Sequence, residues 1–285
     1  MRIRMLALDL DGTLLRDDKT ISEFTLAQLR RCRSLGIKVV VATARSRASA
    51  ARFVELFEVD GAINYGGGTA SVRKGHSTGG YSPREGGQVI AGLGDDTGDL
   101  LVYNALVPAE VADVFIQQCL HTRSVRSVGL AGERSFLTND PDEPKKRDSS
   151  HYVYDDFRSL PNQNAYKIWL ITEDMGAVRQ LADRFDSLTF VTYTGEDMHS
   201  FSSKRAVKDL ALRALADHFG IAMQDVAAFG NDTNDLSMLS ACGVGVAVGS
   251  AVDELKSIAD EVCVSNNEDG VARWIAERIA GDTLV

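Results

Sequence analysis

Short apolar runs and amphipathic stretches alternate at the beginning of the chain. The run RMLALDL (4–10) has the length of a strand and ends at a DGT turn, and the Val-rich run IKVVVAT (37–43) is a second one. Between them, apolar residues recur at helical spacing from Ser22, a typical N-cap residue, to Gly36, which predicts a helix over 22–36. Because unbroken apolar strands are typical of a sheet covered on both faces, the pattern predicts an α/β fold with a parallel sheet.

The same alternation returns in the last third of the chain, where we expect a helix over 203–220 and then an apolar strand. In the middle the texture changes. A stretch rich in turn formers, 66–87, is interpreted as a hairpin plus linker, and it is followed by further strand and helix signals. We therefore expect a core made of residues 1–80 and 194–285, with residues 81–193 inserted into it as a second domain.

Within the insert, YKIWLIT (166–172) predicts a strand and MGAVRQLADRF (175–185) predicts an amphipathic helix. The segment NDPDEPKKRDSS (139–150) is polar and rich in Pro and charge. It is interpreted as an exposed loop of this domain rather than as a boundary between domains.

Composition narrows the class of protein. The 285 residues are 44% hydrophobic and 25% charged, which suits one or two packed cores. The formal charge of -9 argues against a nucleic acid or an anionic membrane as partner, so a small molecule is expected. Four cysteines without a CxxC motif favour reduced thiols in the cytoplasm, and five scattered histidines show no zinc spacing. The oligomeric state stays open.

The first strand ends in Asp9 and Asp11, one residue apart. Alternate residues of a strand point to the same side, so both carboxylates are expected at the carboxyl end of this strand, where open α/β sheets bind ligands. A divalent cation would relieve their repulsion, and Mg²⁺ suits oxygen ligands. The structural alternative is an Asp-Gly turn with incidental acids.

Three further stretches follow the same logic. Thr43 closes the second strand, and its hydroxyl suits a phosphate oxygen. Lys204 is expected at the start of the helix over 203–220, a position that the helix dipole does not favour for a cation. The turn after the later strand holds four oxygen-bearing side chains in five residues: Asn231, Asp232, Asn234 and Asp235. A strand-closing Thr, a solvated Lys and a helix-capping turn are the structural alternatives.

These four motifs, DLDGT, Thr43, Lys204 and GNDTND, in this order resemble those of the haloacid dehalogenase superfamily. The insert lies between the second and third motifs, which resembles the Cof-like subfamily of capped phosphatases. The resemblance covers both halves of the core, whereas the cap matches only in size and texture. It implies a Rossmann-like parallel-sheet core with an inserted α/β cap domain that selects the substrate.

The resemblance also implies roles. Asp9 would be the nucleophile that forms an aspartyl-phosphate, and Asp11 the general acid and base. Mg²⁺ would be held by Asp9, the backbone carbonyl of Asp11 and the acidic loop. The expected metal set is Asp9, Asp11, Asn231, Asp232 and Asp235, and the expected phosphate-binding set is Leu10, Thr43, Ala44, Lys204 and Asn234.

The chain departs from the family pattern at three places. Asn231 stands where the family has an Asp ligand, so its amide oxygen, Asp232 in its place, or a larger share of the binding by Asp235 is expected to serve. VATAR replaces the usual Thr-Gly-Arg, which leaves the amide of Ala44 in place. The family's Asn-Gly after the third strand is spread over INYGGGTA, which contains Asn64.

The function that follows is a Mg²⁺-dependent phosphomonoester hydrolase for a small phosphorylated metabolite, in first place a sugar phosphate. Two alternatives remain. A phosphohexomutase of related fold shares the aspartyl nucleophile but requires added Arg in the cap. A non-catalytic phosphometabolite sensor would explain Asn231.

Overall fold

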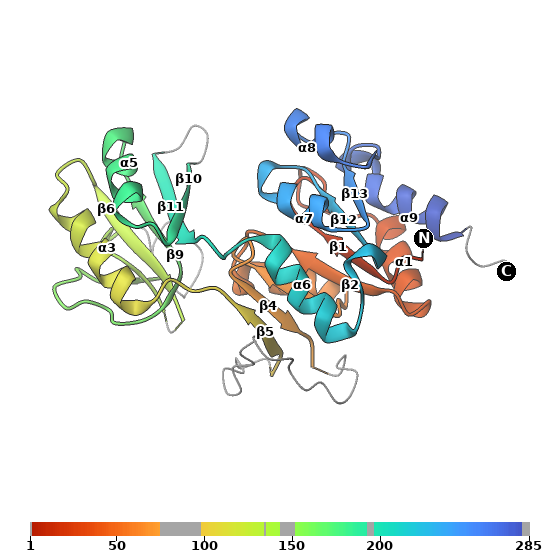
Figure 1. Cartoon of the computed structure of the whole chain (residues 1–285), viewed down its shortest axis with the longest axis horizontal. Helices are drawn as coiled ribbons and strands as arrows, with labels where there is room; N and C mark the ends of the chain where they lie inside the picture. The colour runs from red at the N-terminus through yellow and green to blue at the C-terminus, as the bar shows by residue number, and fades with distance from the viewer. Residues whose placement is uncertain (1, 75–97, 134, 143–151, 193–196, 281–285) are drawn as a thin grey trace. The chain divides into compact units, whose positions relative to one another are not determined.

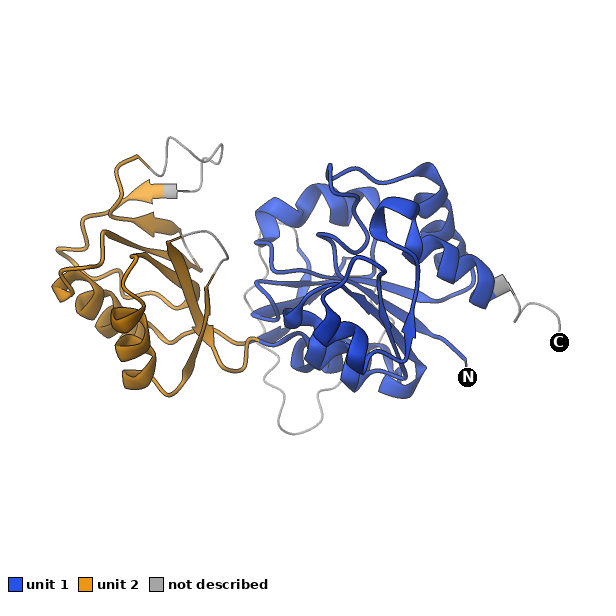
Figure 2. Ribbon diagram, turned by 90° about the horizontal axis from the view of Figure 1, so that it is seen from above, with its two compact units in different colours: residues 1–104, 207–285 blue, residues 105–206 orange. Residues whose placement is uncertain are grey.

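The computed structural model describes residues 2–74, 98–133, 135–142, 152–192 and 197–280 (Figure 1). The chain divides into two compact units (Figure 2). The first contains Met1–Asn104 and Val207–Val285, and the second contains Ala105–Ala206. Among the described residues, no helix is both long and apolar enough to cross a membrane.

The first unit is built around an eight-stranded sheet. Six of its strands are parallel, and β4 and β5 close one side with antiparallel pairing. The central strands β1, β2 and β12 are apolar and buried apart from Lys38 at the start of β2, as expected for a sheet covered on both faces. In spatial order the strands are β14 (Glu261–Val262), β13 (Val244–Ala247), β12 (Val226–Gly230), β1 (Met5–Leu8), β2 (Lys38–Ala42), β3 (Gly61–Asn64), β4 (Thr69–Val72) and β5 (Leu100–Asn104).

Helices lie on both faces of this sheet (Figure 2). They are α1 (Glu23–Ser34), α2 (Arg47–Leu56), α6 (Lys208–Phe219), α7 (Leu236–Ala241), α8 (Asp253–Ile258) and α9 (Gly270–Ala280). The predicted helix over 22–36 is confirmed as α1, and the Ser22 hydroxyl accepts from the Thr25 amide at 3.0 Å as its N-cap. The α/β architecture with a parallel core sheet is likewise confirmed.

In its described residues the second unit is a six-stranded sheet with two helices. Its strands in spatial order are β10 (Leu188–Thr192), β11 (Met198–Ser203), β9 (Ala165–Ile171), β6 (Ser127–Gly132), β7 (Phe136–Thr138) and β8 (Tyr152–Tyr154). Helices α3 (Ala109–His121) and α5 (Met175–Arg184) share an apolar core with this sheet. The strand expected over 166–172 and the helix over 175–185 are confirmed as β9 and α5. Most of the loop predicted at 139–150, and of the linker part of 66–87, lies outside the described residues.

The unit boundaries differ from those expected near 80 and 194. Strand β5 (Leu100–Asn104) pairs with β4 and so belongs to the first sheet, although it follows the stretch that we expected to end the core. Strand β11 (Met198–Ser203) pairs with both β9 and β10 and so belongs to the second sheet. The chain therefore leaves the first unit after Asn104 and returns at Val207.

The helix predicted over 203–220 is wrong in its first turn. Met198–Ser203 is a strand, and Val207 is still extended (φ -127°, ψ 141°), so α6 begins only at Lys208. The reason lies in MHSFSS, where His199, Ser200 and Phe201 are all buried and Phe201 belongs to the apolar core of the second unit. Pairing on both sides holds this segment in the sheet against any helical preference of the following residues.

Candidate active site

Three parallel strands deliver polar residues to one edge of the first sheet. Leu8 is in register with Val41 of β2 and with Phe229 of β12, so these three strands end together. The residues that follow them are Asp9, Thr43 and Asn231. The carboxyl edge of the sheet thus collects the side chains that the sequence pattern predicts there.

Asp9 is buried, with 5% of its surface exposed. Its Oδ1 accepts from Lys208 Nζ at 2.8 Å and its Oδ2 accepts from the Thr13 hydroxyl at 3.0 Å. Burial raises the pKa of Asp9 to about 6, because the loss of solvation outweighs the opposing effect of Lys208. Asp9 is therefore a buried carboxylate with both oxygens directed by hydrogen bonds.

Lys208 is completely buried between two carboxylates. Its Nζ lies 2.8 Å from Asp9 Oδ1 and 2.6 Å from Asp235 Oδ1. Burial alone would lower the pKa of Lys208, but Asp235 and Asp9 raise it above its usual value, so the ammonium stays charged. Oδ2 of Asp235 accepts from the amides of Asn231 and Asp232 at 3.0 and 3.2 Å, which fixes the turn after β12.

Lys208, and not Lys204, is the lysine beside Asp9. Lys204 is exposed, lies in the second unit, and donates its amide to the Ser187 carbonyl. The displacement follows directly from the late start of α6. A sequence signal for Lys208 exists, since it shares a helical stripe with Ala211, Leu212 and Leu215, all of which are buried.

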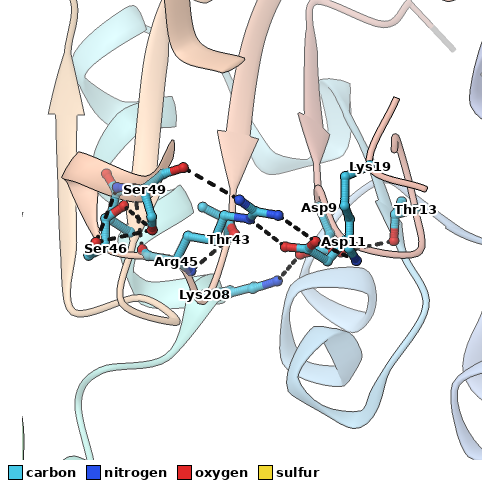
Figure 3. A network of polar contacts seen from close by, with 10 residues as sticks. Asp9, Asp11, Thr13, Lys19, Thr43, Arg45, Ser46, Ser49 and Lys208 are labelled. Atoms are coloured by element: carbon cyan, nitrogen blue, oxygen red, sulfur yellow. Dashed lines mark hydrogen bonds and ion pairs between the residues drawn. The ribbon is translucent and has the colours of Figure 1, made fainter. Parts of the chain in front are cut away.

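Asp11 has different partners from Asp9 (Figure 3). Its Oδ2 accepts from Arg45 Nε at 2.6 Å, and its Oδ1 accepts from an Arg45 terminal nitrogen at 2.7 Å and pairs with Lys19 Nζ at 2.9 Å. The hydrogen bonds from Arg45 lower the pKa of Asp11 to about 2, with Lys19 contributing in the same direction. The sequence motifs do not predict a role for Arg45 or Lys19. An Arg in the turn after a strand that ends at the same sheet edge is the signal that points to Arg45.

The residues expected to bind phosphate are distributed as follows. Thr43 is buried, and its hydroxyl oxygen accepts from the Arg45 amide at 3.1 Å. Leu10 is buried in the turn after β1, whereas Ala44 is exposed in the turn after β2. Asn234 is exposed in the short 3₁₀ turn Thr233–Asp235.

The turn after β1 brings Asn231 to Asp9. Gly12 has a φ of +77°, and a Cβ there would lie 2.5 Å from the Asn231 side-chain amide, so this close approach requires glycine. One Asn231 amide atom faces three oxygens: the carbonyl of Asp11 at 3.1 Å, Oδ2 of Asp9 at 3.3 Å and the hydroxyl of Thr13 at 3.1 Å. With nitrogen in that position the amide donates to all three. With oxygen there, the oxygens of Asp9, Asp11 and Asn231 face one another.

Asp9, the backbone carbonyl of Asp11 and the Asn231 amide form a corner that fits a small divalent cation. Neighbouring ligands of an octahedral Mg²⁺ lie roughly 3 Å apart, close to the separations around the Asn231 amide. The corner consists of one carboxylate, one backbone carbonyl and one side-chain amide, and the described residues contain no cluster of three or more His, Cys, Asp or Glu side chains arranged to hold a metal. Asp232 is exposed and caps its own turn by accepting from the Thr233 amide at 2.6 Å.

A family model described as haloacid dehalogenase-like hydrolase matches residues 6–275. The 5-amino-6-(5-phospho-D-ribitylamino)uracil phosphatase YitU of Bacillus subtilis is 29% identical over 279 residues, covering 96% of each chain. A second B. subtilis phosphatase with the same substrate in its name, YwtE, is 27% identical over 300 residues, covering 98% of this chain and 99% of its own. A crystal structure of a hypothetical protein from Geobacillus kaustophilus superimposes with a TM-score of 0.78 at 20% identity, covering 98% of this chain and 99% of that one.

The chain belongs to the haloacid dehalogenase-like hydrolases, as its motifs implied. Within this family it is a member of the Cof-like group of phosphatases, and it is therefore an enzyme that hydrolyses phosphate esters.

Proposed function

We propose that this chain is a Mg²⁺-dependent phosphomonoester hydrolase that works through an aspartyl-phosphate on Asp9. The observation that carries the proposal is the buried cluster of Asp9, Lys208 and Asp235 at the carboxyl edge of the sheet. Burying three charges costs several kcal/mol per ion unless each is well paired. Such a cluster therefore indicates a role in binding or catalysis rather than a contribution to folding stability.

The reaction begins with attack of an Asp9 oxygen on phosphorus. The bond from phosphorus to the ester oxygen breaks, and the leaving oxygen takes a proton from the protonated form of Asp11, a form that Arg45 and Lys19 disfavour before the substrate binds. Water then attacks the phosphorus of the aspartyl-phosphate, Asp11 takes the proton of that water, and the bond from phosphorus to Asp9 breaks. Inorganic phosphate leaves, and both carboxyl groups return to their starting forms.

The remaining residues hold the phosphoryl group. Lys208 has three N–H donors, of which Asp9 and Asp235 accept two in the described contacts, and the third suits a phosphate oxygen. Thr43 and the backbone amides of Leu10 and Ala44 supply further donors. We thus assign to Lys208 the phosphate-binding role that the sequence suggested for Lys204. Asn234 is assigned to the same task with its side chain in the turn after β12.

Asp9, the Asp11 carbonyl and the Asn231 amide oxygen would hold Mg²⁺. When bound, the metal supplies positive charge that brings the anionic nucleophile and the phosphate together. Asp235 and Asp232 were also expected as ligands. We assign Asp235 instead to holding Lys208 and the backbone of Asn231, and Asp232 to capping its turn.

The proposed substrate is a small phosphorylated metabolite of the sugar-phosphate type. Support comes from YitU and YwtE, whose names give as substrate a phosphate ester on a ribityl chain. We assign selection of the substrate to the second unit. The free state of all four cysteines suits action in a reducing cytoplasm.

The test is release of inorganic phosphate from p-nitrophenyl phosphate and from a panel of sugar and sugar-alcohol phosphates. We expect turnover with Mg²⁺, none with EDTA, and a loss of at least about 10³-fold in Asp9→Asn, which keeps the size of the side chain. Full turnover in Asp9→Asn would refute the aspartyl-phosphate. Turnover that EDTA leaves unchanged would refute the metal, and net transfer of phosphate between two sugar positions would replace hydrolysis by the mutase alternative.

A further inference from the structure

The Asp11 carboxylate is held by a two-pronged ion pair with Arg45. Nε and a terminal nitrogen of Arg45 each donate to a different oxygen of Asp11, at 2.6 and 2.7 Å (Figure 3). Such a fork fixes the plane of a carboxylate as well as its position, which a single contact does not. The Asp11 side chain is 38% exposed, so packing alone does not hold it in one orientation.

Arg45 is itself held from several sides. Its guanidinium carbon lies 4.9 Å from the centre of the Phe53 ring, a terminal nitrogen donates to the Ser49 carbonyl at 3.4 Å, and its amide donates to the Thr43 hydroxyl oxygen at 3.1 Å. These contacts come from the turn after β2 and from α2, both of which are fixed to the core sheet. Arg45 is therefore a placed side chain and not a loose surface cation.

Lys19 is the weaker partner of the same carboxylate. Its Nζ lies 2.9 Å from Oδ1 of Asp11, and 48% of its side chain is exposed. A lysine ammonium is a point charge on a flexible stem, so it adds attraction without fixing an orientation. The two cations thus differ in what they do for Asp11, and this difference makes them a matched pair for experiment.

We propose that Arg45 is a positioning residue that holds the ionised Asp11 in the orientation in which it takes the proton of the attacking water. The inference rests on the proposed function, in which water attacks the phosphorus of the aspartyl-phosphate on Asp9 and the proton passes to Asp11. Removal of the fork leaves Asp11 charged but free to rotate, so the second half of the reaction slows. The first half is less affected when the leaving group is a stable phenolate that needs no proton.

The test uses p-nitrophenyl phosphate with saturating Mg²⁺ in rapid-mixing experiments on Arg45→Ala. We expect a burst of p-nitrophenolate equal to the enzyme concentration, followed by steady turnover slowed about 10- to 100-fold, as for loss of a supporting hydrogen-bond partner. Arg45→Lys is expected to lie between Arg45→Ala and the native chain, because it restores the charge and not the fork. Lys19→Met is expected to slow turnover less than Arg45→Lys does.

The double variant Asp11→Asn/Arg45→Ala separates positioning from other roles. If Arg45 acts through Asp11, the double variant is no slower than Asp11→Asn alone. Losses that multiply, a slowed turnover without a burst, or a faster turnover in Arg45→Ala each overturn the inference. Arg47→Ala, two residues along the chain and paired with Asp99, is the control and is expected to show native kinetics.

Failure of the inference is distinguishable from failure of the proposed function. If Asp11→Asn turns over at the native rate, the role of Asp11 is wrong and Arg45 has nothing to position. If Asp11→Asn shows the burst and the slow phase but Arg45→Ala does not, only the inference fails. Circular dichroism decides whether Arg45→Ala is folded, and Arg45→Lys carries the test if it is not.

Discussion

The two units of the chain treat buried charge in opposite ways. The first unit buries Asp9, Asp60, Lys208 and Asp235. The second buries no Asp, Glu, Lys or Arg side chain within 105–133, 135–142, 152–192 and 197–206, and its buried polar side chains are Ser127, Thr138, Gln163, Thr172, His199 and Ser200. Both ring nitrogens of the buried His199 make hydrogen bonds within the unit, one with the Thr192 hydroxyl at 3.0 Å and one with the Thr172 carbonyl at 3.1 Å.

The difference follows from how the two sheets are built. In a parallel sheet covered on both faces the strands are apolar, and polar side chains lie at the strand ends. In the first unit three such ends meet at one edge. The second sheet is antiparallel except between β7 and β8, so neighbouring strands mostly end at opposite edges and their ends do not collect at one place. Three of the four buried charges, Asp9, Lys208 and Asp235, lie at the shared edge of the first sheet, whereas Asp60 lies beside the start of β2.

The largest effect is expected when the buried cation is removed. Lys208→Met leaves Asp9 and Asp235 buried without their shared partner, which costs about 3–5 kcal/mol of folding stability. Phosphatase turnover should fall at least about 10³-fold, because both phosphate charge and nucleophile orientation depend on Lys208. Urea denaturation and phosphate release measure the two losses.

Lys204→Met is the control for Lys208→Met in the second unit. Lys204 is exposed, so its replacement should change stability by less than about 0.5 kcal/mol and leave the stability of the first unit as it was. A large loss of turnover in Lys204→Met with none in Lys208→Met would restore the lysine suggested by the sequence and reject the one chosen by the geometry.

Asp60 tests whether every buried charge of the first unit affects turnover. It accepts from the Val39 amide at 3.0 Å and from Lys38 Nζ at 2.9 Å, at a site formed by β2 and the residue before β3. Asp60→Asn keeps the shape but weakens both bonds, so we expect a loss of about 1–3 kcal/mol in folding stability. Turnover per folded molecule should not change. If turnover falls while the fold is intact, Asp60 has a functional role that the contacts do not reveal.

A smaller effect is expected from changing the charge of the proposed metal corner. Asn231→Asp adds a carboxylate beside Asp9 and the Asp11 carbonyl, and should tighten Mg²⁺ binding on the order of tenfold, because affinity rises with ligand charge. Without Mg²⁺ the same variant should melt at a lower temperature, since two carboxylates then face each other. Isothermal titration with Mg²⁺ and thermal melting with and without the metal give the two readings.

Asp232→Asn is the matched control for Asn231→Asp. Asp232 is exposed and bonded to its own turn, so its replacement should leave Mg²⁺ affinity nearly unchanged. Equal weakening of Mg²⁺ binding by Asp232→Asn and by Asn231→Ala would return Asp232 to the set of metal ligands.

The sequence predicted the architecture of the core because the relevant signals are local. Continuous apolar runs predicted β1 and β2, Ser22 and Gly36 predicted the ends of α1, and the polar residues after each strand predicted the edge at which Asp9, Thr43 and Asn231 meet. Asp9, Thr43 and Asn231 lie at that edge as a direct result of parallel strand order, which the alternation of strands and helices implies.

What the sequence did not predict depends on contacts between distant segments. Strand β11 is held by pairing with β9, which is about 30 residues earlier in the chain, and a local pattern does not contain that partner. Because β11 was not predicted, the helix was expected to begin at residue 203 and not at Lys208. For the same reason Lys204, and not Lys208, was expected in the site. The fork between Arg45 and Asp11 likewise joins residues from different turns, and only the register of β1 with β2 brings them together.

The smallest effect is expected from removing the surface charge of Asp174 in the second unit. Asp174 is the N-cap of α5 and accepts from the amides of Gly176 and Ala177 at 2.9 and 3.1 Å. The bond from the Ala177 amide is the main cause of a lowered pKa of Asp174, relative to the ordinary 3.8. Because the folded-state pKa lies below the unfolded one, the cap contributes its full stability above pH 3.8 and loses it as the pH falls through the lowered value.

Asp174→Asn tests this expectation, because Asn caps a helix nearly as well but does not titrate in this range. Amide hydrogen exchange of α5 compared between the two proteins at the same pH removes the intrinsic effect of pH on exchange. We expect stronger protection in the native chain at neutral pH and convergence of the two proteins in acid. A difference in protection that stays constant with pH would show that the Asp174 charge does not stabilise α5. Turnover of Asp174→Asn at neutral pH should equal that of the native chain, because Asp174 caps α5 of the second unit, whereas the proposed catalytic residues lie in the first unit.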